Sequence, residues 1–284
     1  MSTEVIVTGT GMPLVVPDRA GPGVLIRSGG LCLQFDVGRS TSARIVAAGT
    51  TLPELSAVFL THYHSDHVVG LQDLVLSHWI ADFDDVAPRL PIVAPNGPTI
   101  RFCERMLDIW DDDLDVRALH NHRTPEPKID LIGFDTPGEP TEVWSHGDVR
   151  VIAGPVRHEP VVGAVGYRVE TPDGIIVITG DTLVCDEVAA LAAGADVVIY
   201  EAMRFDWVYG NPPSMHYITE YHADTRLIGA QMAELDMDTV MLTHLIPPPA
   251  SPEERQAFVD DLRSGGYTGT VVVCDDLERL TLGS

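Results

Sequence analysis

At one point the chain reads Thr61-His62-Tyr63-His64-Ser65-Asp66-His67, with four potential metal ligands within six residues. An apolar run typical of a strand comes directly before this motif, and a helical pattern begins directly after it. In an extended segment, residues two apart face the same side, so we expect His62 and His64 to converge on one cation. If the chain then turns into a helix, Asp66 and His67 face a second cation nearby.

Three more candidate ligands lie downstream, close to the ends of predicted strands: His158, Asp181 and His244. Strand ends are where α/β folds gather ligands from distant parts of a sequence. The two carboxylate oxygens of Asp181 would allow it to bridge two metals. Imidazole and carboxylate without thiolate suit Zn²⁺ best, with Mn²⁺ or iron as alternatives. A chance group of surface histidines is the competing explanation, and the three downstream partners argue against it.

The rest of the chain predicts a mixed α/β fold. Runs of β-branched residues, most of them bounded by turn residues, predict strands at 5–7, 24–26, 31–35, 57–60, 149–153, 165–169, 175–178, 197–200, 240–242 and 270–273. Helical patterns cover 68–80, 99–110, 186–193, 224–235 and 252–263. Residues 81–145 are rich in Pro and Asp and interrupt the strands. We interpret them as a partly helical excursion from a single domain, 1–284, and as a candidate wall of the substrate pocket.

The composition describes a globular protein. The 284 residues include 42 acidic and 18 basic side chains, for a net charge of −24, and 45% are hydrophobic, which excludes disorder. Because the few basic residues are scattered, they would displace few counterions from a phosphate backbone, which argues against nucleic acid as a partner. Four widely separated cysteines, no basic leader and no long apolar segment predict a cytoplasmic protein that does not enter a membrane.

Together these residues resemble the metallo-β-lactamase superfamily, whose pattern is H-x-H-x-D-H followed by His, Asp and His. The resemblance extends over nearly the whole chain and implies a four-layer αββα sandwich with a dinuclear zinc site at one edge. The resemblance implies that one metal is bound by His62, His64 and His158. It implies that the other is bound by Asp66, His67 and His244, and that Asp181 bridges the two. Asp36 resembles an aspartate that the family carries near the start of its sequence, which contacts the metal ligands and orients them without binding the metal itself.

Within the superfamily, Thr8–Pro13 and Tyr221–Asp224 resemble the branch that contains ribonuclease Z and the zinc-dependent alkyl- and arylsulfatase-like hydrolases. In that branch a histidine before the last helix faces the metals and is thought to give a proton to the leaving group, and His222 matches it. A local hydrogen bond at a helix start is the competing explanation for this residue. The catalytic candidates are thus His222 and Asp66, the latter also a ligand.

Two features argue against ribonuclease Z itself. That enzyme usually carries a long Gly- and Pro-rich arm between its third histidine and its bridging aspartate, whereas only 22 residues separate His158 from Asp181. The acidic composition argues the same way. We therefore expect a zinc-dependent metallohydrolase whose metal-bound hydroxide cleaves a small-molecule phosphodiester, sulfate ester or related ester.

Other functions stay open. A lactonase or amidohydrolase would use the same dinuclear site, an RNA processor of the ribonuclease Z type would take a larger substrate, and a non-catalytic protein would keep the metals without turnover. Residues 203–209 alternate aromatic with polar or small side chains, which fits core packing, a substrate lining or a dimer contact. Glu201 either supports His222 or forms a plain salt bridge. Because relatives in this branch often dimerise, a homodimer is a further expectation.

Overall fold

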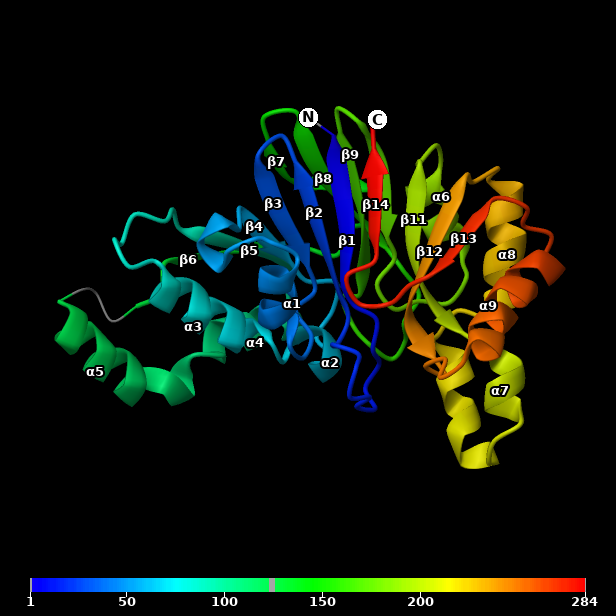
Figure 1. Ribbon diagram of the computed structural model, residues 1–284, viewed down its shortest axis with the longest axis horizontal. Coiled ribbons are helices and arrows are strands. Elements are labelled where there is room, and N and C mark those ends of the chain that lie inside the picture. The colour runs from blue at the N-terminus through cyan, green and yellow to red at the C-terminus, as the bar shows by residue number, and fades with distance from the viewer. Residues whose placement is uncertain (1, 123–125, 284) are drawn as a thin grey trace.

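The centre of the fold is a pair of seven-stranded sheets that lie face to face (Figure 1). The computed structural model describes residues 2–122 and 126–283. One apolar cluster joins the inner faces of the two sheets, and helices cover both outer faces. The four-layer αββα sandwich predicted from the sequence is confirmed.

Each sheet is part antiparallel and part parallel. The first has the order β14 (Arg279–Leu282), β1 (Thr3–Gly9), β2 (Gly23–Ser28), β3 (Leu31–Phe35), β4 (Ala57–Phe59), β5 (Leu90–Pro95) and β6 (Ile129–Phe134). The second has the order β13 (Thr270–Val273), β12 (Thr239–Ile246), β11 (Val197–Met203), β10 (Gly174–Ile178), β9 (Val165–Thr171), β8 (Val149–Pro155) and β7 (Thr141–His146). Strands β3 to β6 are parallel, as are β10 to β13. The segments that follow parallel strands therefore gather at one end of each sheet.

Aromatic residues fill the space between the sheets. The rings of Phe35 and Phe59 are stacked with centroids 4.7 Å apart, and Tyr167 of the opposite sheet lies 5.5 Å from Phe35. Each such pair adds about 0.5–1.5 kcal/mol beyond the burial of its area. The Tyr167 hydroxyl donates a hydrogen bond of 2.7 Å to the carbonyl of Leu60. This bond joins the two sheets just before the histidine motif begins.

The helices pack their apolar faces on the sheets. The first sheet is covered by α1 (Thr41–Ala47), α3 (Leu71–Ala81) and α4 (Pro98–Arg105), and the second by α6 (Asp186–Ala192), α8 (Thr225–Glu234) and α9 (Pro252–Ser264). The others are α2 (Ser65–Val68), α5 (Asp111–Asn121), α7 (Phe205–Tyr209), η1 (Leu52–Glu54), η2 (Asp108–Trp110) and η3 (Pro213–Glu220). Capping fixes where α8 begins, because the Asp224 carboxylate accepts hydrogen bonds from the N–H groups of Arg226 and Leu227.

The excursion expected over residues 81–145 is only partly observed. Helices α4 and α5 do lie in this stretch, and α5 projects from the sandwich (Figure 1). However, β5 and β6 are consecutive strands of the first sheet and β7 is an edge of the second, so much of the stretch belongs to the sheets. The sequence pattern did not indicate these strands, because prolines stand at positions 91 and 95 and acidic residues lie around the short apolar runs. That the chain acts as a single domain stays a prediction.

Two further expectations concern the cysteines and the membrane. All four cysteines are free, and two of them, Cys103 and Cys274, are buried. Within the part of the chain that the structure describes, no helix has the length and apolar character to span a bilayer.

Candidate metal centre

The seven predicted ligands meet at one edge of the sandwich. They lie in the β4–α2 connection (His62 and His64), in α2 (Asp66 and His67), after β8 (His158), after β10 (Asp181) and near the end of β12 (His244). Helix α2 marks this edge, at the lower end of the sandwich in Figure 1 and above the level of α7. All of them except His64 are buried.

The motif is fixed against the segment that follows β3. The Val37 N–H donates to the carbonyl of His67 at 2.7 Å, and the Gly70 N–H donates to the carbonyl of Val37 at 2.9 Å. A Cβ added to Gly38 would come within 2.4 Å of the Asp66 carbonyl oxygen, so only glycine permits this approach. The backbone around α2 is therefore held by close contact between two loops.

Asp181 lies at the centre of the cluster. Its Oδ1 is 3.2 Å from Nε2 of His67, and its Oδ2 is 3.5 Å from Nε2 of His244. The same Oδ2 is 3.9 Å from Nε2 of both His62 and His158. The two oxygens of one carboxylate thus face histidines from both predicted metal sites, which is the geometry that a bridging ligand requires.

The side chains fall into groups of the size that a metal requires. In each group, one ligand atom per residue lies within 4.8 Å of the others, and the groups are His62, His64, His158 and Asp181; Asp66, His67 and His244; and Asp181, His222 and His244. The first two correspond to the two predicted metal sites. The third shows that His222 is close enough to be a ligand itself, which the sequence did not predict.

Hydrogen bonds orient the imidazole rings. Nδ1 of His62 contacts the Thr61 hydroxyl at 3.0 Å, and Nδ1 of His158 contacts the Tyr221 carbonyl at 2.8 Å. Nδ1 of His67 contacts the Asp36 carboxylate at 2.8 Å. In the described structure, Nε2 of His62 and of His67 is buried without a hydrogen-bond partner. A buried ring nitrogen of this kind fits a metal ligand, because its lone pair otherwise lacks a partner.

Three histidines have pKa values that favour the neutral ring. Burial lowers the pKa of His64 and His158, and lowers that of His62 well below its ordinary value. Neighbouring histidines add to the effect, His67 for His62 and His158 for His64. Neutral imidazole is the form that binds a metal, so these three rings are available as ligands at neutral pH.

The carboxylates of the cluster stay ionised. Burial alone would raise the pKa of Asp181, but His244 and His67 outweigh it and hold the value well below the ordinary one. The same balance, with His67 as the main partner, lowers the pKa of Asp66 to about 2. The cluster thus contains two anionic side chains at neutral pH, which is the charge that divalent cations attract.

The sequence matches a family model described as "Beta-lactamase superfamily domain" over residues 34–245. The chain belongs to the metallo-β-lactamase superfamily. This relationship implies divalent metal binding and makes the chain a metal-dependent hydrolase, as predicted.

Individual members of the superfamily are similar over the full length. Ribonuclease Z of Mycobacterium bovis (strain BCG / Pasteur 1173P2) is 34% identical over 279 residues, which cover 98% of this chain and 97% of that protein. The metallo-beta-lactamase fold protein YhfI from Bacillus subtilis has a TM-score of 0.75 at 18% identity and covers 99% of this chain and 100% of its own. The short form of human tRNase Z has a TM-score of 0.71 at 19% identity, with 98% and 99% covered. The two structures support the metallo-β-lactamase fold.

His222 precedes α8 and contacts a buried carboxylate. Glu201 Oε1 lies 2.9 Å from Nδ1 of His222 and also accepts hydrogen bonds from the backbone N–H groups of Ala223, at 3.0 Å, and Thr182, at 3.1 Å. The His222 ring is 5.4 Å from that of His244. Of the two explanations for Glu201, support of His222 is the one observed. The carboxylate thus fixes Nδ1 of His222, and Nε2 has no hydrogen-bond partner among the residues that the structure describes.

The side chains of residues 203–209 mainly pack against other apolar side chains. Met203 and Val208 are buried against Met12 and Ile246, which agrees with the core-packing interpretation. Aromatic residues beside the metal cluster come instead from the following turn, η3, and from the motif itself. Tyr217 of η3 could not be found from the sequence, because an isolated tyrosine in a Pro-flanked segment gives no periodic signal.

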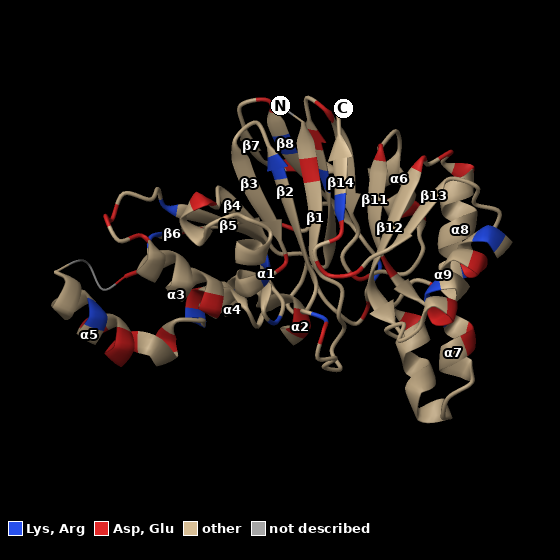
Figure 2. Cartoon of the chain, in the orientation of Figure 1, with Lys and Arg blue, Asp and Glu red and all other residues tan. Residues whose placement is uncertain are grey.

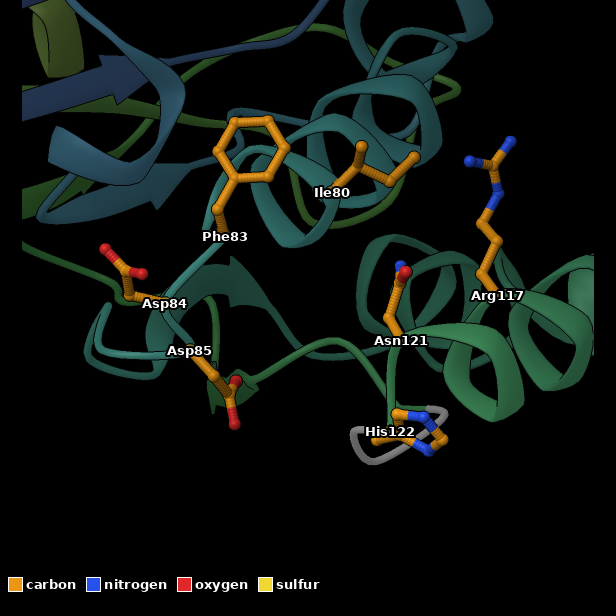
Figure 3. Close-up of a pocket in the computed structure, with 7 residues that line it drawn as sticks. All are labelled: Ile80, Phe83, Asp84, Asp85, Arg117, Asn121 and His122. Carbon is orange, nitrogen blue, oxygen red and sulfur yellow. The ribbon is translucent and has the colours of Figure 1, made fainter.

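A separate cavity of about 730 Å³ opens between the end of α3 and the end of α5 (Figure 3). Its lining residues are Ile80, Phe83, Asp84, Asp85, Arg117, Asn121 and His122. None of them belongs to the metal cluster. A second cavity, lined by His64 and His158, lies at the ligand cluster, and among the described residues none of 81–145 lines it. That this stretch forms a wall of the substrate pocket stays a prediction.

Replacing Asp36 with asparagine is expected to weaken metal binding about 10- to 100-fold, the usual effect of losing a group that orients a ligand. Oδ2 of Asp36 lies 2.8 Å from Nδ1 of His67 and accepts a hydrogen bond from the Thr61 hydroxyl, and an amide nitrogen at that position accepts from neither. Competition with a chromogenic chelator measures the affinity. Asp73→Asn, an exposed carboxylate on α3, is the control. Equal affinities in both variants would contradict the orienting role.

Proposed function

We propose that this chain is an RNA-processing phosphodiesterase of the ribonuclease Z type, with two metal ions in the cluster around Asp181. The observation that carries the proposal is the similarity, 34% identical over 98% of this chain, to a curated protein named Ribonuclease Z. The cluster supplies the chemistry that such an activity needs, because phosphodiester hydrolysis is a typical reaction of dinuclear metal sites.

The predicted small-molecule ester substrate, with nucleic acid excluded as a partner, is corrected by this relationship. The near-full-length relatives carry the name Ribonuclease Z. The net charge of −24 is a sum over the chain, whereas a phosphate responds to the groups within about one Debye length, roughly 8–10 Å. Figure 2 shows acidic residues spread over many elements from α5 to α9, with basic residues among them. The 22 residues between His158 and Asp181 leave no room for the arm that holds RNA, but the candidate ligands on both sides of them are present in the cluster.

The residues fit two divalent cations. His62, His64 and His158 would hold one and Asp66, His67 and His244 the other, with Asp181 between them. Buried polar atoms without a hydrogen-bond partner in the described structure include Nε2 of His62 and of His67 and Oδ1 of Asp181. Because all donors are imidazole or carboxylate groups, we propose zinc, with manganese or iron as alternatives.

When bound, such cations would lower the pKa of a water molecule toward about 7 and would offset charge on the phosphate. The chain's own contribution is to position the reacting groups. Asp66 would accept a hydrogen bond from the attacking water, since its low pKa keeps it ionised. His222, held at Nδ1 by Glu201, would give a proton to the departing ribose oxygen.

The test is cleavage of RNA by the purified protein, with its metal content measured. The panel contains a transfer RNA precursor extended at both ends, an unstructured RNA, a DNA of matching sequence and bis(4-nitrophenyl) phosphate. We expect specific cleavage of the precursor, loss of activity after dialysis against a chelator, and recovery with Zn²⁺. A protein that contains two metals and hydrolyses only the small diester would contradict the RNA proposal and leave the metal site intact.

A further inference from the structure

An aromatic cavity lies directly beside the metal cluster. It has a volume of about 370 Å³, within the range of sites for small ligands. Two cluster histidines, His64 and His158, form one side of it. The remaining side chains that matter here are Tyr63, Tyr217, Tyr221, Glu159 and Glu220.

The aromatic wall is attached to the cluster. The Tyr221 ring lies 5.3 Å from that of His158, nearly perpendicular at 83°, and the Tyr221 carbonyl contacts Nδ1 of His158 at 2.8 Å. The Tyr217 ring is 6.1 Å from that of Tyr221, and the Tyr63 ring is 6.0 Å from that of His64. A planar group among these rings would therefore lie next to whatever the metal cluster binds.

The tyrosines differ in exposure. Tyr217, near the end of η3, is 59% exposed, so much of its ring is available to a ligand. Tyr221 is partly buried, and its ring lies behind that of Tyr217 at the wall of the cavity. Aromatic faces of this kind stack on nucleobases.

The charged side chains that line the cavity argue against a phosphate as its occupant. Its two carboxylates, Glu159 and Glu220, are exposed, and no arginine or lysine lines it. They would repel a phosphate, which cations bound at the neighbouring cluster would attract. Carboxylates accept hydrogen bonds and cannot donate them. They suit a base edge that offers donors, and guanine offers an adjacent imino and amino group, whereas uracil offers a single imino group.

We propose that this cavity binds the base of a nucleotide adjacent to the cleaved bond and that it favours guanine. The inference rests on the proposed RNA substrate. In this arrangement Tyr217 and Tyr221 stack on the base, Glu220 or Glu159 accepts hydrogen bonds from its edge, and the attached phosphate is placed at the metal cluster. The cavity is thereby a determinant of the cleavage position.

The first experiment measures stacking without cleavage. Metal-loaded protein is titrated into RNAs whose scissile linkage is replaced by an uncleavable phosphonate and that carry 2-aminopurine on one or the other side of it, since stacking quenches the fluorescence of this base. We expect quenching at one of the two positions. Tyr217→Ala should remove most of it and weaken binding about 5- to 100-fold, whereas Tyr217→Phe retains it. Tyr209→Ala, another exposed tyrosine outside the cavity, is the matched control.

The second experiment measures base preference with the metal-loaded enzyme. RNAs with each of the four bases at the quenched position are cleaved by the wild type and by Glu220→Gln and Glu159→Gln variants. We expect guanine to give the lowest KM, and one variant to reduce this preference about tenfold with kcat nearly unchanged.

The outcomes separate the two proposals. An enzyme that cleaves RNA with equal quenching in the wild type and Tyr217→Ala, and with no base preference, would overturn the base cavity alone. A protein that neither binds nor cleaves any RNA would overturn the proposed function and the base cavity with it.

Discussion

Asp181→Ala is expected to lower the metal content from two ions per chain to at most one and to reduce RNA cleavage by about 10³-fold or more. Nε2 atoms of four histidines lie within 3.2–3.9 Å of its two carboxylate oxygens, so the substitution removes the charge that both metal groups share. Asp181→Asn should lose nearly as much, because its amide keeps the shape of the side chain but not the charge. Elemental analysis of the purified variants measures the metal content directly.

A matched control separates metal loss from destabilisation. Asp261 is also buried, but its partners are Arg204, at 2.7 Å, and the Thr225 hydroxyl, at 2.9 Å, instead of histidines. Asp261→Asn should lower the free energy of unfolding and retain both metals. If Asp181→Ala is folded by circular dichroism and still binds two ions, the bridging assignment is wrong.

The sequence predicted most of the sandwich because its strands are local. Every predicted strand run coincides with an observed strand, since alternate or continuous β-branched residues identify a strand without knowledge of its partner. The missed strands, β5, β6, β7 and β14, contain proline, glycine or charged residues; β6, β7 and β14 are sheet edges and β5 lies next to one. Their conformation is stabilised by pairing with a neighbour, which is not visible in one segment of sequence.

The candidate site was predicted to a similar extent and for the same reason. The motif around His62 is contiguous, and the distant ligands follow recognisable strands. By contrast, the Tyr221 carbonyl that contacts His158 is a backbone group, and any residue type supplies one. The closeness of His222 to Asp181 and His244 also depends on the packing of α8 against the second sheet. Such contacts follow from tertiary structure alone.

The error about the substrate has a physical origin. Composition gives the total charge of a chain, but the location of the charges is a property of the fold. In this structure the acidic residues are spread over many elements (Figure 2), whereas the candidate ligands gather at one edge of the sandwich, where bound cations would add positive charge. Net charge is therefore a weak argument against a polyanionic substrate when a metal cluster is predicted in the same chain.

His222→Ala is expected to slow RNA cleavage about 10²- to 10⁴-fold, the usual contribution of a general acid. The departing oxygen of a ribose is strongly basic and needs a proton as the bond to phosphorus breaks, whereas nitrophenolate leaves without one. The same variant should therefore lose less than about tenfold on bis(4-nitrophenyl) phosphate, a difference that follows from leaving-group basicity. Steady-state rates on the two substrates measure the contrast.

Two controls identify what His222 does. His216→Ala removes a histidine that contacts the Asn211 carbonyl, at 3.0 Å, and should leave both rates nearly unchanged. Glu201→Gln keeps the size of the residue that holds Nδ1 of His222 and should cost an intermediate loss, about tenfold or more, on RNA only. Because His222 is also close enough to Asp181 and His244 to be a ligand, its variant is analysed for metal. Two retained ions with a substrate-dependent loss support a proton donor, whereas a lost ion with equal losses on both substrates makes it a ligand.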